Sequence, residues 1–442
     1  MKFLFYIFIS LTIFIQCKST KHQGRISDVA NRSAALDQII NEDTLLKNHF
    51  VGVKVYSITE NSDIYNFNSG LQFTPASNVK LITLLACLNI LDDSVTAFKY
   101  IEKGDSLIIL PNADPSFLNS KIDSIQSGFN FIKSNSNKIF IVKNPKSDIP
   151  FYGNGWAWDD YNYSYQSCNS EFPLFGNNIK FTKSSSDKLR ISPTFFSKNI
   201  TYKKGNGRNI LDRNEHENLF NFEFDEIPDN YEVTRPFIPH DETIQALLSD
   251  TLNVEVEIIT ETFDSIQSKA FRSIPSSTLY KEIIQKSDNF IAEQLLLMCS
   301  NNVLNYMNTS TIIKHIKDSI FQNKYDIKWV DGSGLSRYNL ASPDDLVNML
   351  QEIYKLIGLE NVENFFATGL EDDTLDKIYY SANPWIFAKT GSLSNNYCLS
   401  GFIKTDKGNV LAFSFLNNHF TNSRKEIVKS VYNFLSYLKL NY

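Results

Sequence analysis

The segment from Val79 to Leu91, VKLITLLACLNIL, constrains the fold more than any other stretch of this 442-residue chain. Lys80 is its one charged residue, and almost every later position is apolar. A helix that is apolar around its whole circumference is stable only when other elements cover all of its sides. The segment therefore predicts a helix buried in the core of a large domain, with a lysine in its first turn.

Segments typical of β-strands lie near both ends of the chain. Residues 50–58 alternate between apolar and polar, and 64–73 follow after a polar turn, which predicts an early hairpin. Three late strands are predicted at 386–393, 398–405 and 410–418. An amphipathic helix at 423–440 closes the chain. Two early strands, three late strands and helices between them favour one antiparallel sheet completed by both chain ends, in an α+β architecture.

The middle of the chain, residues 100–268, has a different pattern. Short strands and polar turns dominate it, for example SLIIL, KIFIV and VEVEII. This pattern predicts a β-rich domain inserted into a frame made of residues 25–99 and 269–442. Beyond the insert, Ser342 is a predicted N-cap, with Pro343 as the first residue of a helix.

The chain begins with MKFLFYIFISLTIFIQC. Lys2 precedes an apolar run at 3–15, which is short for a membrane span and typical of a secretory signal. With Cys17 directly after it, the segment 1–17 resembles a bacterial lipoprotein signal, although Gln16 stands where such signals usually carry Gly, Ala or Ser. A signal cleaved elsewhere and an uncleaved anchor are the alternatives. We therefore expect a protein on the periplasmic side of a bacterial envelope, anchored through a lipid on Cys17.

Charge and metal-ligand patterns exclude several functions. The formal net charge is −6 and no long basic run occurs, which argues against nucleic-acid binding. The histidines are scattered, and the spacing of the cysteines fits no metal motif. We therefore expect no catalytic metal. Cys87 and Cys299 lie in apolar helical runs and are interpreted as buried free thiols.

Ser77 and Lys80 form the first candidate for chemistry. Their i, i+3 spacing places both side chains on one helix face. A serine needs a base to act as a nucleophile, and a lysine can be that base when burial lowers its pKa. The alternative is a surface lysine that extends from the helix end into solvent. Ser185 and Lys188 have the same spacing, but they lie in a polar stretch that favours a loop.

Two further motifs follow. Ser287, Asp288 and Asn289 open an apolar helix, and the alternative is that Ser287 serves only as its N-cap. The chain contains one Lys-Thr-Gly, at residues 389–391, on a predicted strand. A glycine there allows the close approach of backbone or ligand.

The three motifs in this order are those of penicillin-binding proteins and serine β-lactamases. The longer stretches TPASNVKLIT, KSDNFIAEQLL, DGSGLSRYNLASPDDLV and AKTGSLSNNYCLSGF resemble the class C low-molecular-mass penicillin-binding proteins, the D-alanyl-D-alanine carboxypeptidase/endopeptidases. The resemblance covers nearly all of the chain after the signal segment. It implies a serine DD-peptidase/β-lactamase-like fold, in which 25–99 and 269–442 form the catalytic domain and 100–268 the insert.

The resemblance also implies roles for the residues. Ser77 attacks the carbonyl between two terminal D-alanines of a peptidoglycan stem peptide, and Lys80 takes the serine proton. Ser287 and Asn289, with Lys80, pass a proton to the leaving amine. No cofactor is needed, and β-lactam antibiotics are expected as covalent inhibitors.

Substrate-binding roles follow on the predicted strand. Lys389 and Thr390 bind the terminal carboxylate, and Gly391 lies beside them. The backbone N–H groups of Ser77 and Ser392 form the oxyanion hole.

Two other segments are interpreted less directly. Asp331–Ser336, DGSGLS, is not a Gly-x-Ser-x-Gly elbow, so we expect a tight structural loop beside the site. In GWAWDDYNY, Asp160 matches an acidic residue of the family that reaches the cleft and suits an amino group on the stem's third residue. An aromatic packing cluster with a solvated acidic turn is the alternative for this segment.

Two rival functions remain open from the sequence. A serine β-lactamase shares the motifs, but the large β-rich insert favours an enzyme that acts on the cell wall. A non-catalytic wall-binding lipoprotein is the other alternative, and the intact Ser77, Lys80, Ser287 and Lys389 argue against it.

Overall fold

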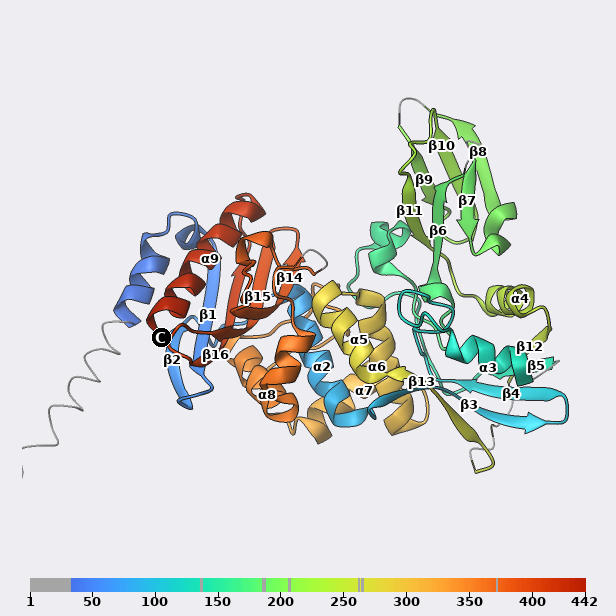
Figure 1. The fold of residues 1–442 in the computed structure, drawn as a ribbon, viewed down its shortest axis with the longest axis horizontal. Helices are drawn as coiled ribbons and strands as arrows, with labels where there is room; N and C mark the ends of the chain where they lie inside the picture. The colour runs from blue at the N-terminus through green and yellow to red at the C-terminus, as the bar shows by residue number, and fades with distance from the viewer. Residues whose placement is uncertain are drawn as a thin grey trace, which may run out of the picture.

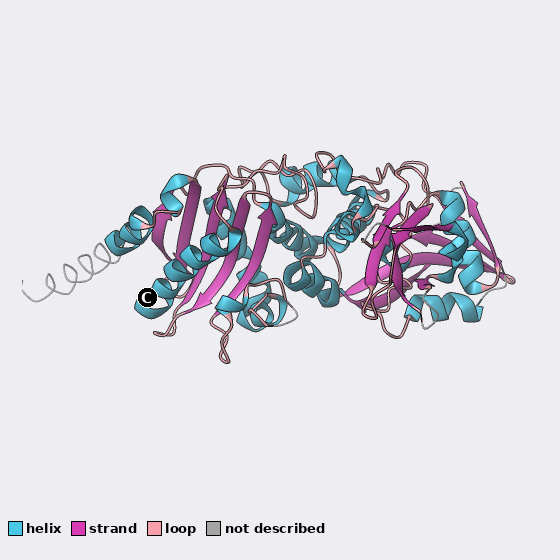
Figure 2. Cartoon of the chain, turned by 90° about the horizontal axis from the view of Figure 1, so that it is seen from above, coloured by secondary structure: helices cyan, strands magenta, loops and turns pink. Residues whose placement is uncertain are grey.

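The computed structural model of the chain describes residues 33–135, 138–184, 188–205, 208–260, 263, 266–370 and 373–442. The predicted signal segment with Cys17, and also Ser185, lie outside the described residues. The molecule is elongated, with one sheet at one end, helices in the middle and a β-rich part at the other end (Figures 1 and 2). Within the described part of the chain, every helix falls short of the length and apolar character that a membrane span requires.

A five-stranded antiparallel sheet joins the two ends of the chain, in the order β14-β15-β16-β1-β2. Its strands are β1 (Phe50–Ser57), β2 (Ser62–Phe67), β14 (Ile386–Leu393), β15 (Asn396–Lys404) and β16 (Val410–Asn418). This confirms the predicted sheet. β2 ends at Phe67, earlier than expected, because Asn68 takes a left-handed conformation that breaks the strand.

Helices cover both faces of this sheet (Figure 1). α9 (Arg424–Asn441) packs on one face, and α8 (Pro343–Phe365) packs on the other. The start of α8 is as predicted, since Ser342 accepts a hydrogen bond from the backbone N–H of Asp345 and Pro343 is the first residue.

A helical layer lies between α8 and the rest of the molecule. Its elements are α2 (Val79–Ile90), α5 (Ser276–Lys281), the π-helical turn η7 (Glu282–Lys286), α6 (Asn289–Leu304), α7 (Thr309–His315) and the π-helical turn η8 (Ile316–Ile320). α2 packs against both α6 and α8, and every residue from Val79 to Cys87 is buried. The predicted central buried helix is therefore confirmed.

The middle of the chain forms three further sheets around a separate hydrophobic core. The largest, β12-β5-β4-β3-β13, contains β3 (Ser94–Lys103), β4 (Ser106–Pro111), β5 (Lys138–Val142), β12 (Glu255–Ile259) and β13 (Lys269–Pro275). β3 and β13 pair antiparallel, so this sheet crosses both predicted domain boundaries, at 99/100 and 268/269. The division into domains itself stays a prediction.

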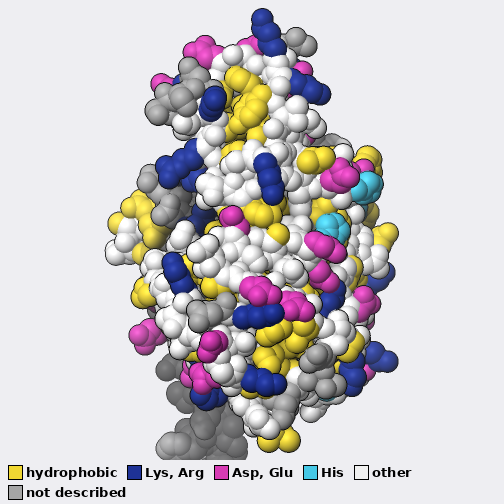
Figure 3. Space-filling view, turned by 90° about the vertical axis from the view of Figure 1, so that its right-hand side faces the viewer, with side chains coloured by type: hydrophobic (Ala, Val, Ile, Leu, Met, Phe, Trp, Pro, Cys, Tyr) yellow, Lys and Arg dark blue, Asp and Glu magenta, His cyan; other side chains and the backbone are white. Residues whose placement is uncertain are grey.

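Two three-stranded sheets form the protruding lobe at the top of Figure 1. They are β11-β6-β7 and β8-β10-β9, made of β6 (Asn178–Lys183), β7 (Leu189–Ser192), β8 (Ile200–Lys204), β9 (Ile210–Arg213), β10 (Phe220–Phe224) and β11 (Glu232–Pro236). The strand pattern of the sequence missed two helices in this half, α3 (Ser127–Asn135) and α4 (Asp241–Leu252). Acidic, basic and hydrophobic side chains are interspersed over the end face of this half (Figure 3).

Short 3₁₀ turns connect these elements. They are η1 (Leu46–Asn48), η2 (Ala76–Asn78), η3 (Trp158–Asn162), η4 (Ser164–Gln166), η5 (Phe175–Asn177), η6 (Thr194–Asn199) and η9 (Lys377–Tyr379). η2 leads directly into α2 and carries Ser77.

Candidate active site

Lys80 lies at the centre of a hydrogen-bond network. Its side chain is fully buried, so the alternative of a lysine reaching into solvent is wrong. Lys80 Nζ donates to Ser77 Oγ at 3.0 Å and to Asn289 Oδ1 at 2.7 Å. A third hydrogen bond, of 2.6 Å, goes to the backbone carbonyl of Ser333. The i, i+3 pair predicted from the sequence is therefore in contact.

The pKa of Lys80 is lowered to about 8, because burial disfavours the charged ammonium. The nearby carboxyl groups of Asp331, Asp288 and Glu293 act in the opposite direction. An amine with a pKa near 8 is neutral in roughly one molecule in ten at pH 7, far more than an ordinary lysine, and the neutral form can accept a proton from the serine that it contacts.

The start of α6 brings the second motif to the same place. Asp288, not Ser287, is the N-cap, since its Oδ1 accepts a hydrogen bond from the Ile291 backbone N–H at 2.9 Å. The interpretation of Ser287 as a simple N-cap is therefore wrong. Ser287 instead has a left-handed backbone with φ of 59°, and its Oγ accepts a hydrogen bond from Lys389 Nζ.

Lys389 on β14 is the second fully buried lysine of the site. Its Nζ donates to Ser287 Oγ at 2.9 Å and to the Thr390 carbonyl at 2.7 Å. Burial lowers the pKa of Lys389 well below its ordinary value, and the positive charge of Lys80 lowers it further. Thr390 Oγ1 donates to Thr374 Oγ1 at 2.9 Å, so a loop that the sequence analysis missed borders the motif.

Gly391 allows β14 to approach the turn that carries the serine. A Cβ atom at Gly391 would lie 2.6 Å from Asn78 Nδ2 and 2.7 Å from the Pro75 carbonyl oxygen, both prohibitively close. The prediction that a glycine here permits close backbone approach is confirmed. Ser392, the next residue, is exposed.

Asp331–Ser336 forms a tight loop beside the site, as predicted. Asp331 accepts hydrogen bonds from the backbone N–H groups of Gly334 and Ser336, at 2.9 and 2.6 Å. A Cβ atom at Gly334 would lie 2.0 Å from the Ala76 carbonyl oxygen, so only glycine permits this contact with η2. The sequence analysis missed that this loop supplies a carbonyl to Lys80. The paired glycines were the one available signal.

Asp160 is joined to the network through one intermediate residue. It lies on η3 beside Tyr165. Burial raises the pKa of the Tyr165 hydroxyl, and the interaction with the Asp160 carboxylate raises it further. The Tyr165 carbonyl in turn accepts a hydrogen bond from Asn289 Nδ2 at 2.9 Å. On the same segment, Trp156 Nε1 donates to Asp331 Oδ2 at 2.9 Å.

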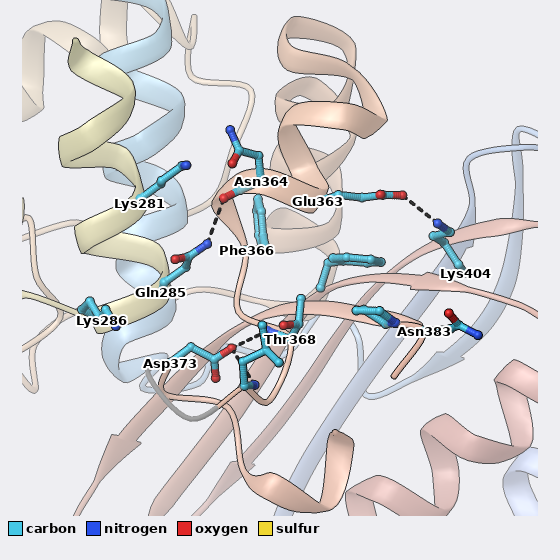
Figure 4. Close-up of a pocket in the computed structure, with 13 residues that line it drawn as sticks. Lys281, Gln285, Lys286, Glu363, Asn364, Phe366, Thr368, Asp373, Asn383 and Lys404 are labelled. Atoms are coloured by element: carbon cyan, nitrogen blue, oxygen red, sulfur yellow. Dashed lines mark hydrogen bonds and ion pairs between the residues drawn. The ribbon is translucent and has the colours of Figure 1, made fainter. Parts of the chain in front are cut away.

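A hollow of about 520 Å³ lies next to the segments that carry Ser287 and Lys389, since Lys286 and Phe387 are among the residues that line it (Figure 4). Phe387 on β14 and Gln285 on η7 line it, and Gln285 also accepts a backbone hydrogen bond from Thr374. Figure 4 shows the hydrogen bond that the Gln285 side chain donates to the Asn364 carbonyl, and the ion pair between Lys404 and Glu363. The volume of this hollow is within the range of ligand-binding clefts.

The comparison with protein families agrees with the geometry. The model of the D-Ala-D-Ala carboxypeptidase 3 (S13) family matches residues 32–195 and 240–438. The chain belongs to this family. The predicted family, and the enzyme class of serine carboxypeptidase, are therefore confirmed. The unmatched residues 196–239 contain β8, β9, β10 and β11, most of the protruding lobe.

Individual relatives and solved structures give the same result. The chain is 31% identical over 167 residues to the D-alanyl-D-alanine carboxypeptidase DacB of Haemophilus influenzae, an alignment of 36% of this chain and 35% of that protein. It is 23% identical to the penicillin-sensitive carboxypeptidase A of Dictyostelium discoideum, over 84% of this chain and 82% of that protein. The crystal structure of penicillin-binding protein 4 (dacB) from Haemophilus influenzae superposes with a TM-score of 0.73 at 21% identity, covering 92% of this chain and 99% of that one. The predicted fold is therefore confirmed.

Proposed function

We propose that the protein hydrolyses D-Ala-D-Ala termini, and D-Ala-containing crosslinks, of peptidoglycan through an acyl-enzyme on Ser77. The observation that carries this proposal is the buried Lys80, whose Nζ lies 3.0 Å from Ser77 Oγ and whose pKa is about 8. A covalent intermediate divides amide hydrolysis into two easier steps.

In the first step, Ser77 Oγ attacks the carbonyl carbon of the penultimate D-alanine while Lys80 Nζ takes its proton. The backbone N–H groups of Ser77 and Ser392 stabilise the oxyanion, and one such donor typically contributes about 10²–10³ in rate. The close approach of β14 to η2 at Gly391 brings these two backbone segments together, which supports this assignment.

The leaving amine then needs a proton. We assign this proton transfer to Lys80, Ser287 and Asn289. The contacts of Lys80 with Ser77 and Asn289 support the assignment, whereas Ser287 contacts Lys389. Lys389 and Thr390 bind the carboxylate of the departing residue. Water then attacks the acyl-enzyme, with Lys80 again as the base, and Ser77 is restored.

Asp160 is proposed to bind an amino group on the third residue of the stem peptide. Its link to Asn289 through Tyr165 supports a position beside the cleft. The leaving group of a crosslink is larger than free D-alanine, and the hollow lined by Gln285 and Phe387 is the space that we propose for it.

The test of the nucleophile is Ser77→Ala with a fluorescent penicillin. We expect a stable label on the wild type and none on the variant, together with loss of D-alanine release from a pentapeptide. Rapid turnover of penicillin by the wild type would indicate a β-lactamase, and no label on the wild type would indicate a non-catalytic wall-binding protein. Persistent labelling of Ser77→Ala would overturn the assignment of Ser77.

The proposed substrate places the protein on the periplasmic side of a bacterial envelope, and we propose that Cys17 anchors it there through a lipid. The sequence of the first 17 residues supports this proposal. Radiolabelled palmitate should enter the wild type and not Cys17→Ala. Incorporation into the variant would contradict it.

A further inference from the structure

Two cysteines meet in the core between the helices that carry the site. Cys87 lies in the last turn of α2, and Cys299 lies near the end of α6, 212 residues later. Their Sγ atoms are 3.8 Å apart, and both side chains are fully buried in the same hydrophobic cluster. The sequence analysis interpreted both as buried free thiols from their apolar helical runs, and both are free and buried in this structure.

We propose that Cys87 and Cys299 form a disulfide bond in the exported protein. The proposal rests on the proposed function in one respect, namely that a peptidoglycan hydrolase is exported to the oxidising side of the membrane. Disulfides form and persist in that compartment. A disulfide has an S–S length of about 2.05 Å, so the two sulfur atoms must approach by about 2 Å, which side-chain rotation and small helix shifts can supply.

The bond forms by thiol–disulfide exchange with an oxidised dithiol oxidoreductase or a small-molecule disulfide. One cysteine thiolate attacks the oxidant's disulfide, which forms a mixed disulfide and releases one oxidant thiolate. The second cysteine thiolate then attacks the sulfur of the first, forms the Cys87–Cys299 bond and releases the other oxidant thiolate. The two cysteines lose two electrons and two protons, and the oxidant's disulfide is reduced to two thiols.

Burial determines when this exchange can occur. Burial raises the pKa of the Cys87 thiol well above its ordinary value, and its contact with Cys299 adds to the effect. Neither sulfur is accessible in the folded protein, so oxidation takes place during folding, before α2 closes on α6. Afterwards the same burial protects the bond from reductants.

The consequence concerns the catalytic site. α2 begins just after Ser77 and contains Lys80, while α6 begins at Asn289. A covalent link between the two helices holds the Lys80–Asn289 contact against local separation. Because the bond closes a very long loop, it restricts the unfolded chain strongly.

The experiment is a thiol map of protein exported to the periplasm of an expression host. The protein is denatured without reductant, alkylated and digested, and the peptides with Cys87 and Cys299 are identified by mass spectrometry. We expect these two to be unmodified and joined, whereas the buried Cys168 and Cys398 are alkylated and serve as internal controls. Dithiothreitol should reduce the bond only when denaturant is present.

Variants test the consequence. Cys87→Ala should leave Cys299 open to alkylation. Wild type that is reduced in denaturant and refolded with reductant should melt on the order of 5–10 °C below the oxidised wild type, whereas the same treatment should not change the Tm of Cys87→Ala/Cys299→Ala. Alkylation of both Cys87 and Cys299 in the wild type without reductant would overturn the proposal. Penicillin labelling of the same samples reports the proposed function separately, so the two hypotheses can fail independently.

Discussion

The surroundings of Lys80 and of Lys389 differ in charge, although both lysines are fully buried and both contact a serine. Around Lys80, the carboxyl groups of Asp331, Asp288 and Glu293 oppose the effect of burial, and the pKa is about 8. Around Lys389, the charge that acts is that of Lys80, which adds to the effect of burial. Two lysines of one site are therefore held in different electrostatic environments.

This difference is the basis on which we propose two separate roles for the two lysines. A lysine with a pKa near the working pH can accept and return a proton, as a general base must. Among the described residues, no carboxyl group is among the causes of the pKa shift of Lys389, and we propose that the carboxylate of a substrate supplies its counter-ion. We therefore assign proton transfer to Lys80 and carboxylate binding to Lys389, and the following experiments test that distinction.

The largest effect is expected from Lys80→Ala. Loss of the base should slow acylation by about 10²–10⁴-fold, measured as the rate of labelling with a fluorescent penicillin. Lys188→Ala is the matched control, because Lys188 belongs to the other Ser-x-x-Lys sequence and is exposed. Equal rates for Lys80→Ala and the control would remove Lys80 from proton transfer.

A smaller, substrate-dependent effect is expected from Lys389→Ala. Losing a charge-assisted contact costs about 1.5–3 kcal/mol, so kcat/KM on a peptide with a free terminal carboxylate should fall by roughly 10- to 150-fold. A peptide whose terminus is an amide should be affected much less. If both peptides lose the same factor, Lys389 supports the fold of the site and does not bind the carboxylate.

The pH dependence of the acylation rate tests how the neighbouring carboxyl groups affect the pKa of Lys80. Because Lys80 acts when neutral, acylation should increase as the pH rises through about 8. Asp288→Asn removes a charge that raises the pKa of Lys80, so the increase should move to lower pH. Asparagine caps helices as well as aspartate does, so the melting temperature should change little. An unmoved pH profile would mean that Asp288 does not influence the base.

The smallest effect is expected from Asp160→Ala. Asp160 is partly exposed, and exposed ion pairs contribute about 0.2–1 kcal/mol. The variant should lose up to about fivefold in kcat/KM on stem peptides with a free amine at the third residue, and nothing on a neutral analogue. Equal loss on both peptides would indicate a folding role, whereas no loss would leave Asp160 as a surface residue.

Much of the fold could be predicted from local sequence patterns. The strands β14 and β16 match the predicted ranges 386–393 and 410–418, and the cap at Ser342 is as expected. These features depend on periodicity and on short-range hydrogen bonds, which neighbouring residues determine. The limits of the insert were harder to predict from the sequence. β3 and β13 pair across a long stretch of chain, and the sequence of neither strand indicates its partner.

The sequence by itself determined the order and residue types of the motifs, the buried helix that begins after Ser77, and the membership in the D-Ala-D-Ala carboxypeptidase 3 (S13) family. Only the tertiary structure decided which groups surround each lysine. The carbonyl that binds Lys80 comes from Ser333, 253 residues later in the chain, and Thr374 reaches Thr390 from a separate loop. A pKa depends on burial and on charges within a few ångströms, and packing determines both.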